Sequence, residues 1–117
     1  MADLQAQLKI LGDAYATQLP EKLQQIEQAW AELPPTGWDE NGFESLHRMV
    51  HSLAGSGKTF GFSLLGDAAR ALEQYLKPLV QEKKELSDSQ RNRIQELMRE
   101  LRQAQHRDPA PDTLTNA

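Results

Sequence analysis

The segment HSLAGSGKTFGFSLLGDAARALEQYL, residues 51–76, decides the fold class of this chain. Its second half repeats apolar residues at spacings of three and four, which is the pattern of one buried helix face. The first half continues an apolar pattern of the same spacing that begins at Phe43. Residues 59–61 separate this first pattern from the second. We therefore predict two consecutive helices, the second over about residues 62–80. The two apolar faces consist of Phe43, Leu46, Val50, Leu53 and Gly57, then Phe62, Leu65, Ala69, Leu72, Leu76 and Leu79.

The N-terminal part of the chain carries a similar apolar pattern, which Pro20 divides in two. Proline is tolerated in the first turn of a helix but not in its middle. We therefore predict a short helix over about residues 3–16 and a second over about 18–33, with Thr17 as a candidate cap. A single kinked helix is the alternative. The apolar residues are Leu4, Leu8, Leu11 and Tyr15, then Leu19, Leu23, Ile26, Trp30 and Leu33.

Breaker and capping residues mark the other helix ends. PPTGWDENG, residues 34–42, predicts a loop, so that the next helix begins near Asp39 or Asn41. Ser87, with Gln90 three positions later, has the capping-box pattern at the start of the last helix. Each predicted helix thus has a recognisable boundary.

Four main helices with short connections, each with one apolar face, indicate an all-α chain folded as an antiparallel four-helix bundle. A short extra N-terminal helix completes the expected fold. We expect residues 1–106 to form this bundle as one domain, and residues 107–117 to be a disordered tail or linker.

Composition narrows the classes of function. The chain has no cysteine, which excludes disulfides and thiolate metal sites. Its net charge of -4 argues against a broad nucleic-acid surface, and no apolar run approaches the roughly 20 residues of a membrane span. The N-terminal sequence MADLQAQLKI is amphipathic and acidic, unlike a secretion signal. We therefore expect a cytoplasmic protein that binds neither nucleic acid nor membrane, and we expect a monomer.

The GSGKT sequence at residues 55–59 has the ending of a nucleotide-binding P-loop. A P-loop requires the pattern G-x-x-x-x-G-K-[ST] between a strand and a helix. The position that needs the first glycine is Ser52, and the preceding residues FESLHRMV have helical periodicity. Both requirements fail, so we expect no nucleotide site.

His51 lies outside the apolar face of its predicted helix, so its ring should face solvent. An exposed imidazole is largely uncharged at neutral pH and can act as a nucleophile. Gly55 leaves the space beside the ring open, and Lys58 lies two turns, or roughly 10 Å, further along the same side. Glycine inside a helix costs about 1 kcal/mol relative to alanine. Open access to the ring at Gly55 and close helix approach at Gly57 would each explain the presence of a glycine despite this cost. The alternative is that both glycines simply fray the end of the helix.

His47 and His51 are four residues apart in HRMVH and share one side of the helix. Such pairs can bind zinc. A third ligand is not obvious, since Glu44 is only a candidate helper and His106 follows the last predicted helix. We therefore expect no metal site, and we place His47 at the flank of the candidate site.

Residues 51–76 resemble a histidine-containing phosphotransfer domain, most closely the phosphoacceptor domain of chemotaxis-type histidine kinases. The family pattern has an apolar residue two positions after the histidine and glycines four and ten positions after it. Here these residues are Leu53, Gly55 and Gly61, and TFGF at 59–62 strengthens the comparison. The resemblance covers the two central helices closely and the outer helices by pattern only. It implies an antiparallel four-helix bundle.

The resemblance implies roles for His51 and Glu73. His51 would accept and pass on a phosphoryl group. Glu73, 22 positions later, would accept a hydrogen bond from Nδ1 of the ring and leave Nε2 free to attack phosphorus. The family usually has lysine three positions after the histidine, and here that residue is Ala54. Lys58 is our candidate for the missing phosphate-stabilising charge.

The resemblance also implies partners. These are a response-regulator receiver domain, a sensor histidine kinase, or both, and the chain itself would be a phosphotransfer intermediate without its own ATP-binding site. We expect no cofactor in this chain, with magnesium held by the partner. Ala54 with Gly55, together with His47 and Gly61, would give site access and docking. The alternative function is a helical interaction bundle that docks a signalling partner without being phosphorylated.

Overall fold

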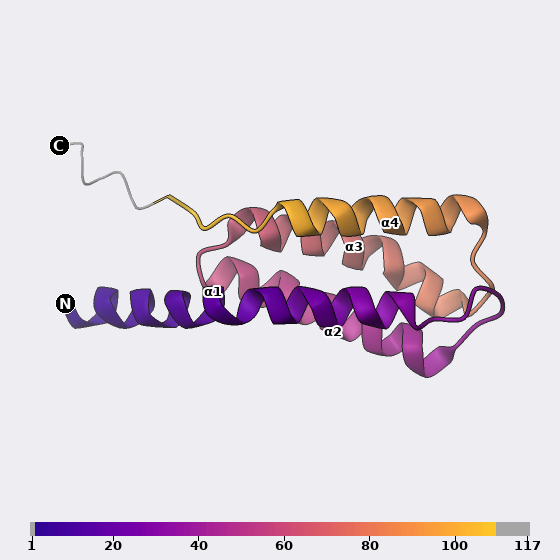
Figure 1. Ribbon diagram of the computed structural model, residues 1–117, viewed down its shortest axis with the longest axis horizontal. Coiled ribbons are helices and arrows are strands. Elements are labelled where there is room, and N and C mark those ends of the chain that lie inside the picture. The colour runs from indigo at the N-terminus through magenta and orange to yellow at the C-terminus, as the bar shows by residue number, and fades with distance from the viewer. Residues whose placement is uncertain (1, 110–117) are drawn as a thin grey trace.

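The structure is an all-α bundle of four helices (Figure 1). It is a computed structural model that describes residues 2–109 of the chain. The helices are α1 (Ala2–Ala31), α2 (Glu40–Thr59), α3 (Ser63–Glu82) and α4 (Asp88–Gln103). Consecutive helices pack against each other, α2 and α3 most extensively, and the described part of the chain contains no strand. The largest fully buried side chains are Phe43, Ile26, Leu46, Leu65, Leu72, Leu76, Ile94 and Val50.

Both predicted helix starts after the loops are confirmed. The Asp39 side chain caps α2 by accepting a hydrogen bond from the Gly42 backbone N–H, with an N–O distance of 3.2 Å. At the start of α4, Ser87 N–H donates to Gln90 Oε1 at 2.9 Å, and Gln90 N–H donates to Ser87 Oγ at 3.1 Å. These contacts satisfy backbone donors that have no partner inside the helix.

The predicted extra N-terminal helix is wrong, because α1 continues without a break from Ala2 to Ala31. Pro20 lies inside this helix but on its exposed side, where water can bind the carbonyl group that loses its N–H partner. Thr17 does not cap a second helix. Its hydroxyl donates to the Asp13 carbonyl oxygen, one turn earlier, at 3.0 Å.

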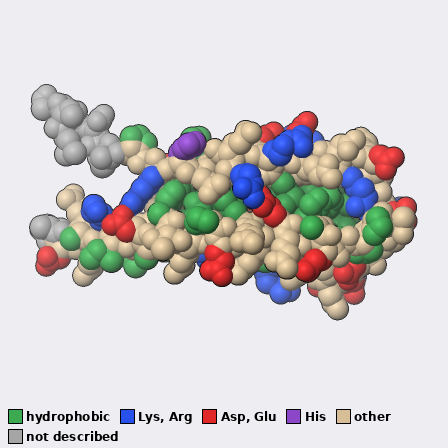
Figure 2. Space-filling model, in the orientation of Figure 1, with side chains coloured by type: hydrophobic (Ala, Val, Ile, Leu, Met, Phe, Trp, Pro, Cys, Tyr) green, Lys and Arg blue, Asp and Glu red, His purple; other side chains and the backbone are tan. Residues whose placement is uncertain are grey.

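The first turns of α1 extend beyond the other three helices (Figure 1). The sequence pattern predicts a buried face there, yet Leu4, Leu8 and Leu11 are 62%, 54% and 50% exposed. Figure 2 shows hydrophobic side chains along this end of the helix. From Tyr15 onward the face is buried, apart from Trp30, which is partly buried. The apolar pattern is therefore longer than the bundle that covers it.

Two glycines allow α2 and α3 to approach closely. A Cβ atom added to Gly57 would lie 3.1 Å from the backbone nitrogen of Gly66 and 3.2 Å from its Cα. The predicted role of Gly57 in close helix approach is confirmed. The turn between the two helices contains Gly61, whose φ of +88° is a conformation that residues with side chains rarely adopt.

The segment after α4 packs against the bundle. Asp108 accepts hydrogen bonds from the Ser63 backbone N–H at 2.9 Å and from the Ser63 hydroxyl at 2.6 Å, at the start of α3. Arg107 donates to Asp13 of α1, and this bond holds the pKa of the Asp13 carboxyl below its usual value. The predicted tail is therefore attached at its first two residues. Pro109 is exposed, and residues 110–117 lie outside the described part of the chain.

Replacing Gly57 by alanine should lower the free energy of unfolding by about 1–3 kcal/mol, because the new methyl group would force α2 and α3 apart. Gly55 provides a matched control on the same helix, since a Cβ atom there meets nothing within 4 Å. Gly55→Ala should raise the free energy of unfolding by up to about 1 kcal/mol. Chemical denaturation of both variants measures the two effects, and a stabilising Gly57→Ala would contradict the close approach.

Candidate functional site

His51 and Glu73 meet across the contact between α2 and α3. Nδ1 of His51 and Oε2 of Glu73 form a hydrogen bond. The His51 side chain is 70% exposed, whereas that of Glu73 is 13% exposed. The predicted exposure of the His51 ring is confirmed, and the carboxylate that holds the ring lies at the edge of the core.

This hydrogen bond determines which ring nitrogen carries the proton. An ionised carboxylate can only accept hydrogen bonds, so Nδ1 of His51 carries the hydrogen and donates it to Glu73. Nε2 then keeps its lone pair on a ring that solvent reaches. The carboxylate also favours positive charge on the ring, which develops when Nε2 forms a new bond. The pair is therefore an oriented nucleophile.

Each member of the pair directly follows a buried residue. In α2, Val50 is fully buried, and His51 comes 100° further around the helix axis. In α3, Leu72 is fully buried, and Glu73 follows it in the same way. Both side chains therefore leave the core at the boundary between the two helices, where they can meet.

A cleft of about 400 Å³ surrounds the pair. Arg48 lies one turn before His51, and Lys77 lies one turn after Glu73, so each helix brings a cation to the cleft. An accessible ring nitrogen is thus combined with positive charge that favours an anionic reactant. The lining residues are Glu44, His47, Arg48 and His51 of α2, and Glu73 and Lys77 of α3.

Two predicted site residues do not reach this cleft. Nζ of Lys58 forms an ion pair with Oδ1 of Asp67 at 2.9 Å, and Lys58 does not line the cleft. Ala54 is only 1% exposed. The prediction of an exposed Ala54 at a docking surface is therefore wrong. The residue lies one turn after Val50, on the apolar side of α2 that packs against α3.

The other predicted residues lie nearer to their expected places. Gly55 is exposed, and the space beside it is open. Gly61 belongs to the turn after α2, where its backbone conformation is the structural requirement. His47 lines the cleft, and its Nε2 lies 3.9 Å from Oε2 of Glu73. The centres of the two histidine rings are 6.4 Å apart.

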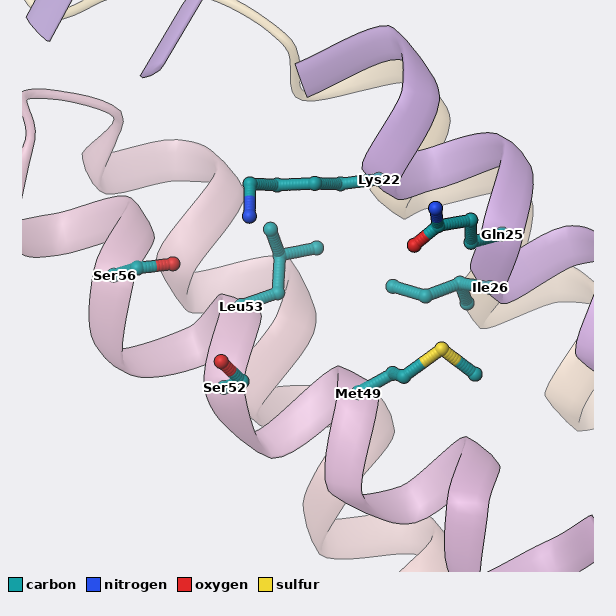
Figure 3. Close-up of a pocket in the computed structure, with 7 residues that line it drawn as sticks. All are labelled: Lys22, Gln25, Ile26, Met49, Ser52, Leu53 and Ser56. Atoms are coloured by element: carbon teal, nitrogen blue, oxygen red, sulfur yellow. The ribbon is translucent and has the colours of Figure 1, made fainter. Parts of the chain in front are cut away.

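A second groove, of about 120 Å³, lies between α1 and α2 (Figure 3). It combines apolar, hydroxyl and amide groups with one lysine, and its lining includes no histidine or carboxylate. This groove is therefore a surface beside the site rather than a second reactive centre. It is lined by Lys22, Gln25 and Ile26 of α1, and by Met49, Ser52, Leu53 and Ser56 of α2.

The GSGKT segment does not form a phosphate-binding loop. Residues 55–59 are the last turns of α2, whereas a P-loop connects a strand to the start of a helix. Across residues 2–109, no three His, Cys, Asp or Glu side chains are grouped so as to hold a metal ion. No described helix has the length and apolar character needed to cross a membrane.

A family model for the Hpt domain matches residues 11–104. The match includes parts of all four helices and begins near the point where α1 joins the bundle. The chain belongs to the Hpt domain family. Hpt domains are phosphotransfer intermediates that act between kinase and receiver domains and lack the ATP-binding site of a kinase. No curated protein matches the chain closely enough to be counted as a relative.

Two cations of the cleft in this Hpt domain, Arg48 and Lys77, are not among the site residues predicted from the sequence. A signal for both exists in helical spacing. Lys77 is four residues after Glu73, and Arg48 is three residues before His51, so each shares a helix side with a residue of the pair. By the same helical spacing, Lys58 lies on the His51 side of α2. Spacing along one helix does not reveal its ion pair with Asp67 of α3.

The Glu73→Ala variant should change the tautomer of His51, because the acceptor for Nδ1–H is lost. At neutral pH, the uncharged His51 ring of the unaltered Hpt domain should carry its hydrogen mainly on Nδ1. The variant should gain a large population with hydrogen on Nε2, which ¹⁵N NMR of the ring distinguishes. Glu44→Ala removes another carboxylate of the cleft and should have little effect. Equal tautomer populations with and without Glu73 would contradict the orienting role.

Proposed function

We propose that this Hpt domain carries its phosphoryl group on Nε2 of His51 and exchanges it with an aspartate of a response-regulator receiver domain. The observation that supports this most strongly is the exposed ring whose Nδ1 is bonded to Glu73. The other two histidines fit the role less well. His47 is only 25% exposed, and His106 follows α4 and does not line the cleft.

The transfer is a nucleophilic displacement at phosphorus. The lone pair of Nε2 forms the N–P bond while the P–O bond of the aspartyl phosphate breaks, and the electrons of that bond leave with the aspartate carboxylate. No proton has to move, because Nδ1 keeps its hydrogen in the bond to Glu73. The Glu73 carboxylate balances the positive charge that the His51 ring acquires. The return of the group to a receiver follows the same steps in reverse.

Arg48 and Lys77 supply the phosphate-stabilising charge in this proposal, because both line the cleft around His51. The phosphoryl group carries negative charge on its oxygens during transfer, and nearby cations lower the barrier. Lys58, the candidate from the sequence, would contribute only after its ion pair with Asp67 opens. We therefore rank Lys58 below the two cations of the cleft.

The receiver would dock on the exposed side of α2 around His51. Ser52 and Gly55 are exposed on this helix, and the groove in Figure 3 continues the surface toward α1. Signalling encounters of this kind are commonly weak and transient. The TFGF sequence at 59–62 supports a likeness of this chain to the phosphoacceptor domain of chemotaxis-type histidine kinases. We propose a cytoplasmic monomer, since the net charge of -4 opposes self-association.

Phosphotransfer from a receiver or kinase should label this Hpt domain with an acid-labile phosphoryl group, and His51→Gln should abolish the label. The reason is that the amide of glutamine has no nucleophilic ring nitrogen. His106→Gln is the matched control and should be labelled normally. A label that persists in His51→Gln would refute the site. A wild-type chain that no receiver or kinase of its source organism labels would favour the interaction bundle that is not phosphorylated.

The same assay ranks the cations. Arg48→Ala and Lys77→Ala should each slow transfer by about tenfold or more, because each loses charge beside the reacting phosphoryl group. Lys58→Ala should have the smallest effect of the three. A larger loss in Lys58→Ala than in either other variant would reverse the ranking.

A further inference from the structure

His47 has an unsatisfied nitrogen next to the reactive pair. Its Nε2 is buried and has no hydrogen-bond partner among the described residues. The carboxylate oxygen Oε2 of Glu73 lies 3.9 Å away, just beyond hydrogen-bond distance. This oxygen is the same atom that accepts from Nδ1 of His51. A buried polar atom without a partner is uncommon and requires an explanation.

We propose that His47 is a positioning residue that competes with His51 for Glu73, so that protonation of His47 slows phosphoryl transfer. This inference rests on the proposed role of His51 as phosphoacceptor. His47 acts through Glu73 and does not contact the phosphoryl group itself.

The charge of His47 decides how strongly it competes. An uncharged His47 leaves the carboxylate of Glu73 to the His51 ring. A protonated His47 carries hydrogen on both ring nitrogens and places a positive charge about 4 Å from the shared oxygen, where attraction in a partly buried site is substantial. The carboxylate then turns toward His47 and balances less of the charge that His51 acquires during N–P bond formation.

The other charged groups around His47 do not produce this change. From α2, Glu44, Arg48 and His51 line the cleft, and from α3, Glu73 and Lys77 line it. The lining of this cleft includes no residue of α1 or α4. Arginine, lysine and carboxylate side chains ordinarily keep their charge between pH 5 and 8, whereas histidine ordinarily does not. Among the residues that line the cleft, the two histidines are therefore those of a type that ordinarily changes its charge over this range.

The first test is an NMR titration of the His51 ring between about pH 5 and 8, the range over which histidine ordinarily changes its charge. In the wild-type Hpt domain, the ring signals should follow two steps, one from His51 and one from His47, because interacting groups titrate as a pair. His47→Gln keeps a neutral donor at this position, and His47→Leu removes the donor. Both variants should show one step. His106→Gln removes a histidine that lies outside the cleft and should keep both steps.

The second test is the rate of phosphorylation by phosphoramidate, a small donor that needs no partner protein. Between about pH 8 and 5, the rate for the wild type should fall about tenfold further than the rate for His47→Gln. The reason is that a nearby opposite charge commonly stabilises a charged ring by about tenfold or more, and protonated His47 draws the Glu73 carboxylate away from the reacting ring. Protonation of His51 itself also slows both proteins, and dividing each rate by the fraction of uncharged ring from the NMR titration removes this contribution. Thermal unfolding of each variant confirms that the compared proteins are folded.

The outcomes separate the two proposals. Coincident His51 titrations in the wild type and both His47 variants would overturn the competition, even if His51 is phosphorylated normally. Coincident rate profiles would overturn the effect of His47 on transfer. A third outcome is that the His47 variants change the His51 titration, but no donor phosphorylates any of the proteins. This outcome would support competition for the Glu73 carboxylate and refute the role of His51 as phosphoacceptor.

Discussion

The close packing of α2 against α3 is the constraint on which the site depends. The two helices lie so close at Gly57 and Gly66 that neither position has room for a Cβ atom. This contact fixes the distance between α2 and α3. Glu73 of α3 can then bond Nδ1 of His51 on α2 while the ring stays in solvent. The nitrogen that we propose as the phosphoacceptor is defined by a contact between helices, because neither helix alone determines the tautomer of the ring.

Much of the fold could be predicted from helical periodicity and caps. α2, α3 and α4 each have one apolar face, and Asp39 and Ser87 mark two of the starts. Periodicity failed at α1 because it identifies an apolar face but not the length of the bundle that covers it, so Leu4 is exposed. It also could not show that Pro20 lies on the solvent side of a continuous helix.

The candidate site was predictable only in part. Helical spacing places His51 in solvent, but Glu73 is 22 residues away on another helix, and only the family resemblance pointed to it. The sequence pattern of α2 alone predicts roles for Lys58 and Ala54. Their neighbours on α3 decide their roles, since Asp67 engages Lys58 and the contact with α3 buries Ala54. Contacts between helices arise from packing, which the pattern of a single helix does not contain.

The most direct test of this account is the position of the phosphoryl group on the ring. Phosphorylated protein labelled with ¹⁵N in its histidines would show, through coupling between phosphorus and nitrogen, which atom carries the group. The account predicts coupling to Nε2 of His51, with hydrogen retained on Nδ1. Coupling to Nδ1 of His51, or to either nitrogen of His47 or His106, would contradict it.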